Sequence, residues 1–158
     1  MVACVALGSA ACSSSSSKAT PSFTKGVTVF FTPGGAHAPA LPASFVNCVY
    51  AKLPSGDRST IASLTATSDV AKLSDASGVR LTRAADQCDA SLTNQLIEAS
   101  AFAGAPASIS AAQKTCATGK IISSLAALDD AKLKGSNTST VQSAVQSALK
   151  SCGVSLSG

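Results

Sequence analysis

The sequence predicts a mainly α-helical protein in which two tandem disulfide-stapled three-helix repeats follow a flexible N-terminal tether. Three observations lead to this prediction. Alanine and serine make up about a third of the 158 residues, and alanine forms helices readily but buries little apolar surface. Six cysteines are available to staple such a small core. From Phe45 onward the chain also repeats itself, with cysteines at matching positions.

The first 17 residues predict export and a membrane anchor. Residues 1–11, MVACVALGSAA, are apolar and end in small residues, as the distal part of a signal peptide does, and they are too short to cross a bilayer. Cys12 then precedes five serines, a composition typical of a flexible spacer. The stretch LGSAAC with its serine run resembles the lipobox and tether of a bacterial lipoprotein. That resemblance implies cleavage before Cys12 and a diacylglyceryl group on its thiol; the alternative is a buried Cys12 or a disulfide, for example with Cys4.

Residues 12–44 are predicted to form a tether and linker. The expected structure around Val27–Phe31 is a partly ordered linker that docks on the helices through its phenylalanines. The alternative is one short edge strand, because this run has high β propensity and is closed by a Pro-Gly-Gly turn. Residues 36–44, AHAPALPAS, predict extended, polyproline-like chain.

The internal repeat divides the remainder into residues 45–104 and residues 105–158. Each copy is expected to hold three short helices, and a connecting helix is expected around residues 91–102. The matching positions are Cys48 and Cys116, Lys52 and Lys120, Ser63-Leu64 and Ser124-Leu125, Ala71-Lys72-Leu73 and Ala131-Lys132-Leu133, and Cys88 and Cys152.

Residues with capping preferences predict where these helices begin and end. The expected N-terminal positions are Pro42, Asp57, Ser68 or Asp69, Ser108, and Asn137 or Thr138, and the expected C-caps are Gly78 and Gly135.

The cysteines of the body predict two disulfides. Four cysteines allow three connectivities, and the repeat favours pairing within each copy, which gives Cys48–Cys88 and Cys116–Cys152. Closing loops of this length contributes roughly 4 kcal/mol each in the chain-entropy model. Structural disulfides also predict an oxidising, extracytoplasmic compartment.

No residue pattern predicts catalysis, a metal or a cofactor. His37 is the sole histidine and lies in a Pro/Gly-rich loop, and no zinc-ligand spacing or phosphate-binding glycine motif occurs. Arg83 is expected to share a surface ion network with Asp86 and Asp89. The basic residues are dispersed and not interleaved with aromatics, so nucleic-acid binding is not expected. The equivalent Lys52 and Lys120 are weak candidates for an anionic ligand.

Two cysteines around short helices, repeated after a lipobox, resemble the small secreted lipoproteins of actinobacterial type, which are generally of unassigned function. The resemblance implies a fold and a location on the outer face of the cell membrane. We therefore expect a non-enzymatic surface lipoprotein, held to the membrane by its lipid and acting on an unknown protein partner as an interaction or envelope-structural module. The alternative is a small secreted carrier that binds a lipid or other apolar ligand between its alanine-rich helices.

Overall fold

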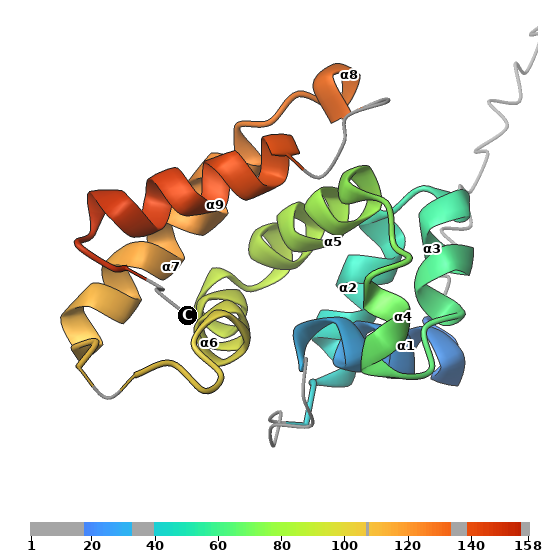
Figure 1. The fold of residues 1–158 in the computed structure, drawn as a ribbon. Coiled ribbons are helices and arrows are strands. Elements are labelled where there is room, and N and C mark those ends of the chain that lie inside the picture. Colours follow the sequence, from blue (N-terminus) through green and yellow to red (C-terminus); the bar gives the residue numbers. More distant parts are fainter. Residues whose placement is uncertain (1–17, 33–39, 107, 134–138, 156–158) are drawn as a thin grey trace, which may run out of the picture.

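The computed structural model describes residues 18–32, 40–106, 108–133 and 139–155, and within these ranges the regular elements are all helices (Figure 1). The predicted mainly α-helical class is therefore confirmed. The elements are α1 (Pro21–Phe31), α2 (Ala43–Lys52), α3 (Ser55–Ala62), α4 (Thr67–Val70), α5 (Asp75–Cys88), α6 (Ala90–Ala101), α7 (Ala111–Ala126), α8 (Asp130–Leu133) and α9 (Ser139–Ser151).

Several positions singled out in the sequence lie outside the described residues. They are the signal-like residues 1–11, Cys12 with its serine run, His37, Gly135, Asn137 and Thr138.

Residues 21–31 form helix α1, so the expected linker is helical here and the alternative, an edge strand at Val27–Phe31, is wrong. Thr20 caps the helix by accepting a hydrogen bond from the Phe23 backbone N–H, and proline at the first helical position is preorganised for this start. Phe23, Val27 and Phe31 recur every four residues and are at most 1% exposed. Burial of this single helical face outweighs the local β propensity of the run. The predicted linker thus contains a helix that belongs to the core.

Helix α1 lies very close to α3 at Gly26. A Cβ atom built on Gly26 would lie 1.8 Å from the backbone oxygen of Ile61. Only glycine lets the two backbones approach to this distance.

In the first half of the body, helices α2 to α5 follow one another through short breaks. Pro42 precedes α2, as predicted. Leu53 is extended because the residue before a proline avoids the helical region, and this separates α2 from α3.

Three predicted boundaries in this half are wrong. Asp57 lies within α3 and is buried rather than capping it. Ser74 caps α5 by accepting from the Ser77 backbone N–H, so Gly78 lies inside a helix and does not end one. Asp69 lies inside α4, where its carboxylate accepts from the Ala66 backbone N–H.

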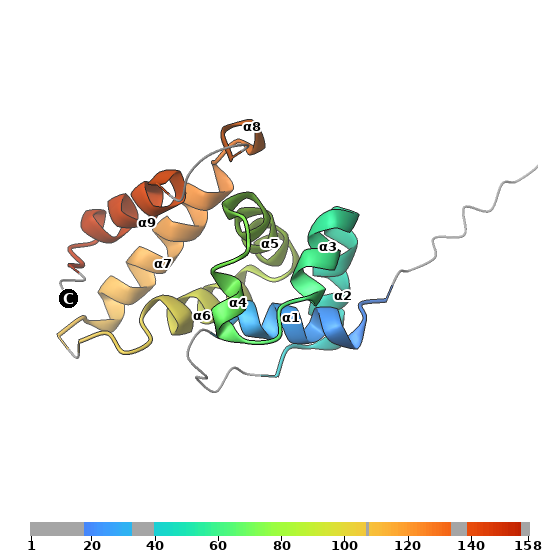
Figure 2. The ribbon, with the colours of Figure 1, turned by 45° about the vertical axis from the view of Figure 1, so that its right-hand side comes forward.

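In the second half, α7 and α9 pack side by side in opposite directions (Figures 1 and 2). The connecting helix α6 is confirmed and is capped by Asp89, which accepts from the Leu92 backbone N–H. The cap of α7 is Ser110 instead of the predicted Ser108, because Ser110 and Gln113 form a reciprocal capping box. Helix α7 runs unbroken and contains no proline, whereas Pro54 follows the break between α2 and α3.

The two disulfides have the predicted pairing. Cys48–Cys88 joins α2 to α5, and Cys116–Cys152 joins α7 to the turn after α9; both have Cα atoms 5.9 Å apart. The apolar core is continuous between the halves: it includes Val49 and Leu81 from one and Ile121 from the other. Each disulfide therefore staples one end of a shared core.

Two buried threonines on facing helices lack hydrogen-bond partners for their side chains. Thr93 on α6 is 0% exposed and Thr118 on α7 is 1% exposed, and neither hydroxyl has a partner among the described residues. Valine has the same shape without the polar group, so Thr118→Val is expected to raise the free energy of unfolding by about 1 kcal/mol. Urea denaturation of the oxidised protein measures this.

The matched control is Thr82→Val, because Thr82 is equally buried but donates to the Gly78 carbonyl at 3.0 Å. This variant loses a hydrogen bond and is expected to be no more stable than the wild type. If Thr118→Val also failed to stabilise, a buried water would have to satisfy that hydroxyl.

Candidate functional site

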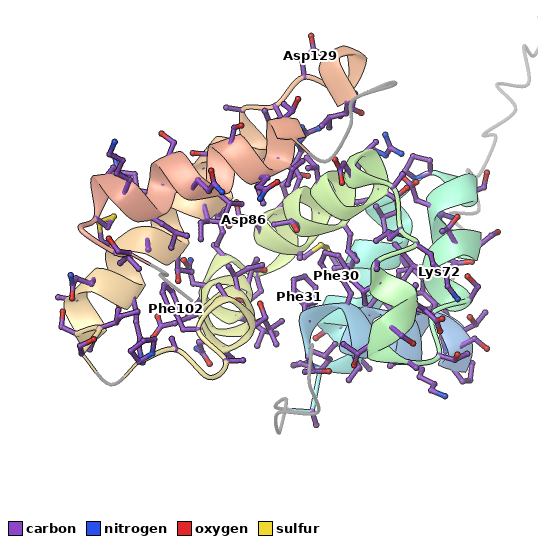
Figure 3. The ribbon with its side chains drawn as sticks, viewed as in Figure 1. Phe30, Phe31, Lys72, Asp86, Phe102 and Asp129 are labelled. Carbon is purple, nitrogen blue, oxygen red and sulfur yellow. A yellow bond between two sulfur atoms is a disulfide. The ribbon has the colours of Figure 1, made fainter. Side chains whose placement is uncertain are left out.

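A pocket of about 190 Å³ lies where α1, α4, α5, α7 and α9 converge. Figure 3 shows Phe30, from the C-terminal part of α1, between α1 and α5. The walls are largely apolar. The lining residues are Phe30, Val70, Leu73, Ser74, Asp75, Gly78, Val79, Thr82, Leu125 and Val141.

The local sequence explains why this space stays open. Helix α4 is a single turn, and the Ser74 cap starts α5 directly after Leu73, so residues from α4, from this short connection and from α5 all reach the pocket wall. Gly78 contributes no side chain to the wall. A Cβ atom there would lie 3.6 Å from the Phe30 ring and 3.9 Å from Leu73 Cδ2, so an alanine would fit without a clash but would occupy this space.

Asp75 is the charged residue of the lining. Its Oδ2 atom is buried and has no hydrogen-bond partner among the described residues. The other polar groups of the wall are already used: Ser74 Oγ bonds Ser77, and Thr82 Oγ1 donates to the Gly78 carbonyl. Asp75 thus brings an unsatisfied acceptor to the pocket wall, which a bound molecule reaches only if the carboxylate turns toward it.

The volume sets the size of the occupant. An engineered apolar cavity of about 150 Å³ holds benzene, whereas pockets for drug-sized ligands measure about 300–1,000 Å³. At about 190 Å³ the pocket suits a molecule built around one small ring or a short branched chain. A whole diacyl lipid or a sterol exceeds this volume and would extend beyond the pocket, which is partly open to solvent.

A second polar cluster is centred on Asp57, which is 5% exposed. Its carboxylate accepts from Arg80 Nε at 2.6 Å and Nη2 at 2.9 Å, and from Ser77 Oγ at 2.8 Å. The Arg80 hydrogen bonds hold the pKa of Asp57 below its usual value, against the opposing effect of burial. A bidentate, partly buried pair of this kind fixes α3 against α5.

Arg83 belongs to the same cluster, and its predicted network with Asp86 and Asp89 is not what the structure forms. Its Nη1 donates to Asp130 Oδ1 at 3.0 Å and its Nη2 to the Leu128 carbonyl at 2.6 Å. Asp89 caps α6 instead. The planar guanidinium of Arg83 thus donates to two acceptors, one in α8 and one just before it.

The two candidate lysines do not form one site. Lys52 is exposed and lines a groove of about 290 Å³ that also contains Arg80, Arg83 and Asp130. The arginines of this groove are already paired with carboxylates, so the arrangement is that of a structural ion network. Lys120 is exposed on α7 and is not part of this lining.

Sequence reasoning missed the pocket residues. Asp75 and Phe30 carry no distinctive spacing, and Gly78 resembles a helix end. A weak signal was available in Gly78, because an isolated glycine inside a helical pattern often has a packing or functional reason.

In the part of the chain that the structure describes, no helix combines the length and the apolarity needed to span a bilayer. Within the same ranges, no group of three or more His, Cys, Asp or Glu side chains is placed to hold a metal ion. The two disulfides indicate an oxidising, extracytoplasmic environment.

Comparison of the chain with protein-family models, with curated proteins and with solved structures gave no match.

Proposed function

We propose that this protein is a non-enzymatic lipoprotein, held at the outer face of a bacterial membrane through Cys12, whose helical domain binds a small apolar ligand. This combines the expected anchor with the carrier alternative derived from the sequence. The support for the location is the lipobox-like sequence before Cys12 together with the two disulfides.

The pocket between α1 and α5 is the observation that carries the binding function. Its walls are mainly aliphatic and aromatic, with few polar groups, which is the usual composition of a small-molecule site. The polar groove at Lys52 gives less support to a role with a protein partner, because its arginines are already paired with carboxylates.

The anchor is tested by the intact mass of the protein from the membrane fraction of a lipoprotein-processing bacterium. We expect a chain that begins at Cys12 and carries a diacylglyceryl group. On reduction the mass should rise by two hydrogen atoms for each of the two disulfides. An unlipidated species that retains residues 1–11 would contradict the anchor.

The binding function is tested with ethylbenzene, a neutral molecule of suitable size, by titration of the ¹⁵N-labelled domain in two-dimensional NMR. Saturable shifts are expected at the amides of Gly78, Val79 and Phe30, which line the pocket. Unchanged spectra up to the solubility limit of ethylbenzene would contradict an apolar binding site.

A further inference from the structure

We infer that the pocket selects a small organic cation, namely a primary amine with a compact apolar body. This inference rests on the proposed ligand-binding function and specifies the chemical class of ligand for the same site.

The charge of the lining is the first argument. Asp75 is its acidic residue, and among the described residues the lining contains no lysine, arginine or histidine. Its Oδ2 is shielded from solvent without a donor among the described residues, which is an unfavourable state for a carboxylate oxygen. An ammonium group supplies three N–H donors and a positive charge. The terminal torsion of an aspartate is soft, so Oδ2 can turn toward a donor inside the pocket.

The aromatic and aliphatic walls are the second argument. Phe30 borders the same space as Asp75, and an ammonium near an aromatic face gains cation–π attraction, which strengthens where water is excluded. Val70, Leu125 and Val141 lie around the remaining volume and match an apolar body. The lining therefore joins one anionic group and one aromatic ring to largely apolar walls.

Gly78 provides the third argument, because it keeps the space beside Phe30 open. Alanine is the better helix former, and a Cβ atom at this position would make only ordinary van der Waals contacts, 3.6 Å from the Phe30 ring and 3.9 Å from Leu73. The chain uses alanine freely in its helices, including Ala84 and Ala85 of the same helix. Glycine at position 78 thus gives up helix stability and gains room in the pocket.

The test compares 2-phenylethylamine with ethylbenzene on the full disulfide-bonded protein, by the same NMR titration at neutral pH. The two probes share their apolar body and differ in the ammonium group. We expect the amine to bind about tenfold more tightly than the hydrocarbon. Asp75→Asn is expected to remove this preference, so that the two probes bind the variant with equal affinity.

Two glycine variants test the shape of the site. Gly78→Ala is expected to raise the urea midpoint of unfolding and to weaken the binding of both probes. Gly119→Ala, within α7 and with no atom within 4 Å of the added Cβ, is the control. It is expected to raise the midpoint in the same way and to leave binding unchanged.

The outcomes separate this inference from the function on which it rests. Equal affinities for the two probes, unaffected by Asp75→Asn, would overturn the selection of cations and leave the apolar binding function standing. Binding of neither probe would overturn both. The comparison of probes on the wild-type protein needs no variant, so a poorly folded Asp75→Asn protein does not compromise the test.

Discussion

Gly26→Ala is expected to lower the free energy of unfolding by at least about 3 kcal/mol. The added Cβ would lie 1.8 Å from the Ile61 backbone oxygen and 2.7 Å from its carbonyl carbon, so no side-chain rotation relieves the clash. Helix α1 must move away from α3. That movement loosens the burial of Phe23 and Val27, both 0% exposed. Urea denaturation of the oxidised protein provides the measurement.

Gly56→Ala is the matched control for this substitution. Gly56 lies in α3, the partner helix, and nothing lies within 4 Å of its added Cβ. Because alanine is the better helix former, this variant should be unchanged or stabilised by up to about 1 kcal/mol. If Gly26→Ala instead stayed within about 0.5 kcal/mol of wild type, the usual range for a surface substitution, α1 would not pack on α3 as described.

The contact at Gly26 shows why α1 could not be predicted from its own residues. Locally, Val27–Phe31 favours a strand, and only the docking of a buried face on helices elsewhere in the chain makes it a helix. Thr20 and Pro21 were the available signals, as a cap followed by a proline at the first helical position.

The features that could be predicted depend on short-range patterns or on cysteine spacing. Helix α6 follows from local apolar periodicity, and the pairing of Cys48 with Cys88 follows from the spacing of the cysteines in the apparent repeat. The ion cluster could not be predicted in this way, because Asp57 and Arg80 are 23 residues apart and the charges of the chain allow many pairings. The pocket is harder still to predict from the sequence, since its walls come from five helices whose angles depend on the packing of the whole core.

Asp57→Asn is expected to destabilise the protein by about 3 kcal/mol at neutral pH. Removing one partner of a buried ion pair typically costs about 3–5 kcal/mol. The lower end applies here because the Arg80 side chain remains 25% exposed and water can solvate part of it. The neutral amide introduced by this substitution would also leave Ser77 with a weaker acceptor than the carboxylate to which it donates at 2.8 Å.

The pH dependence of this effect has a definite sign. Hydrogen bonds from Arg80 lower the pKa of Asp57 in the folded state, whereas in the unfolded chain the pKa is about 3.9. The pair therefore contributes its full stability above about pH 4 to 5, and loses it as the pH falls through the folded-state pKa. The difference in unfolding free energy between wild type and Asp57→Asn should be constant from about pH 5 to 7 and shrink in more acidic solution.

Asp130→Asn distinguishes the buried pair from the surface part of the same cluster. The Asp130 side chain is 44% exposed, against 7% for Asp57, although both carboxylates contact Arg80. Exposed pairs contribute about 0–1 kcal/mol, so Asp130→Asn should cost no more than this and show less dependence on acid. Equal losses for the two variants would mean that burial does not govern the cluster. Because Asp57 joins α3 to α5, a helix that lines the pocket, a large loss for Asp57→Asn alone would identify this pair as the polar contact that holds α5 in place.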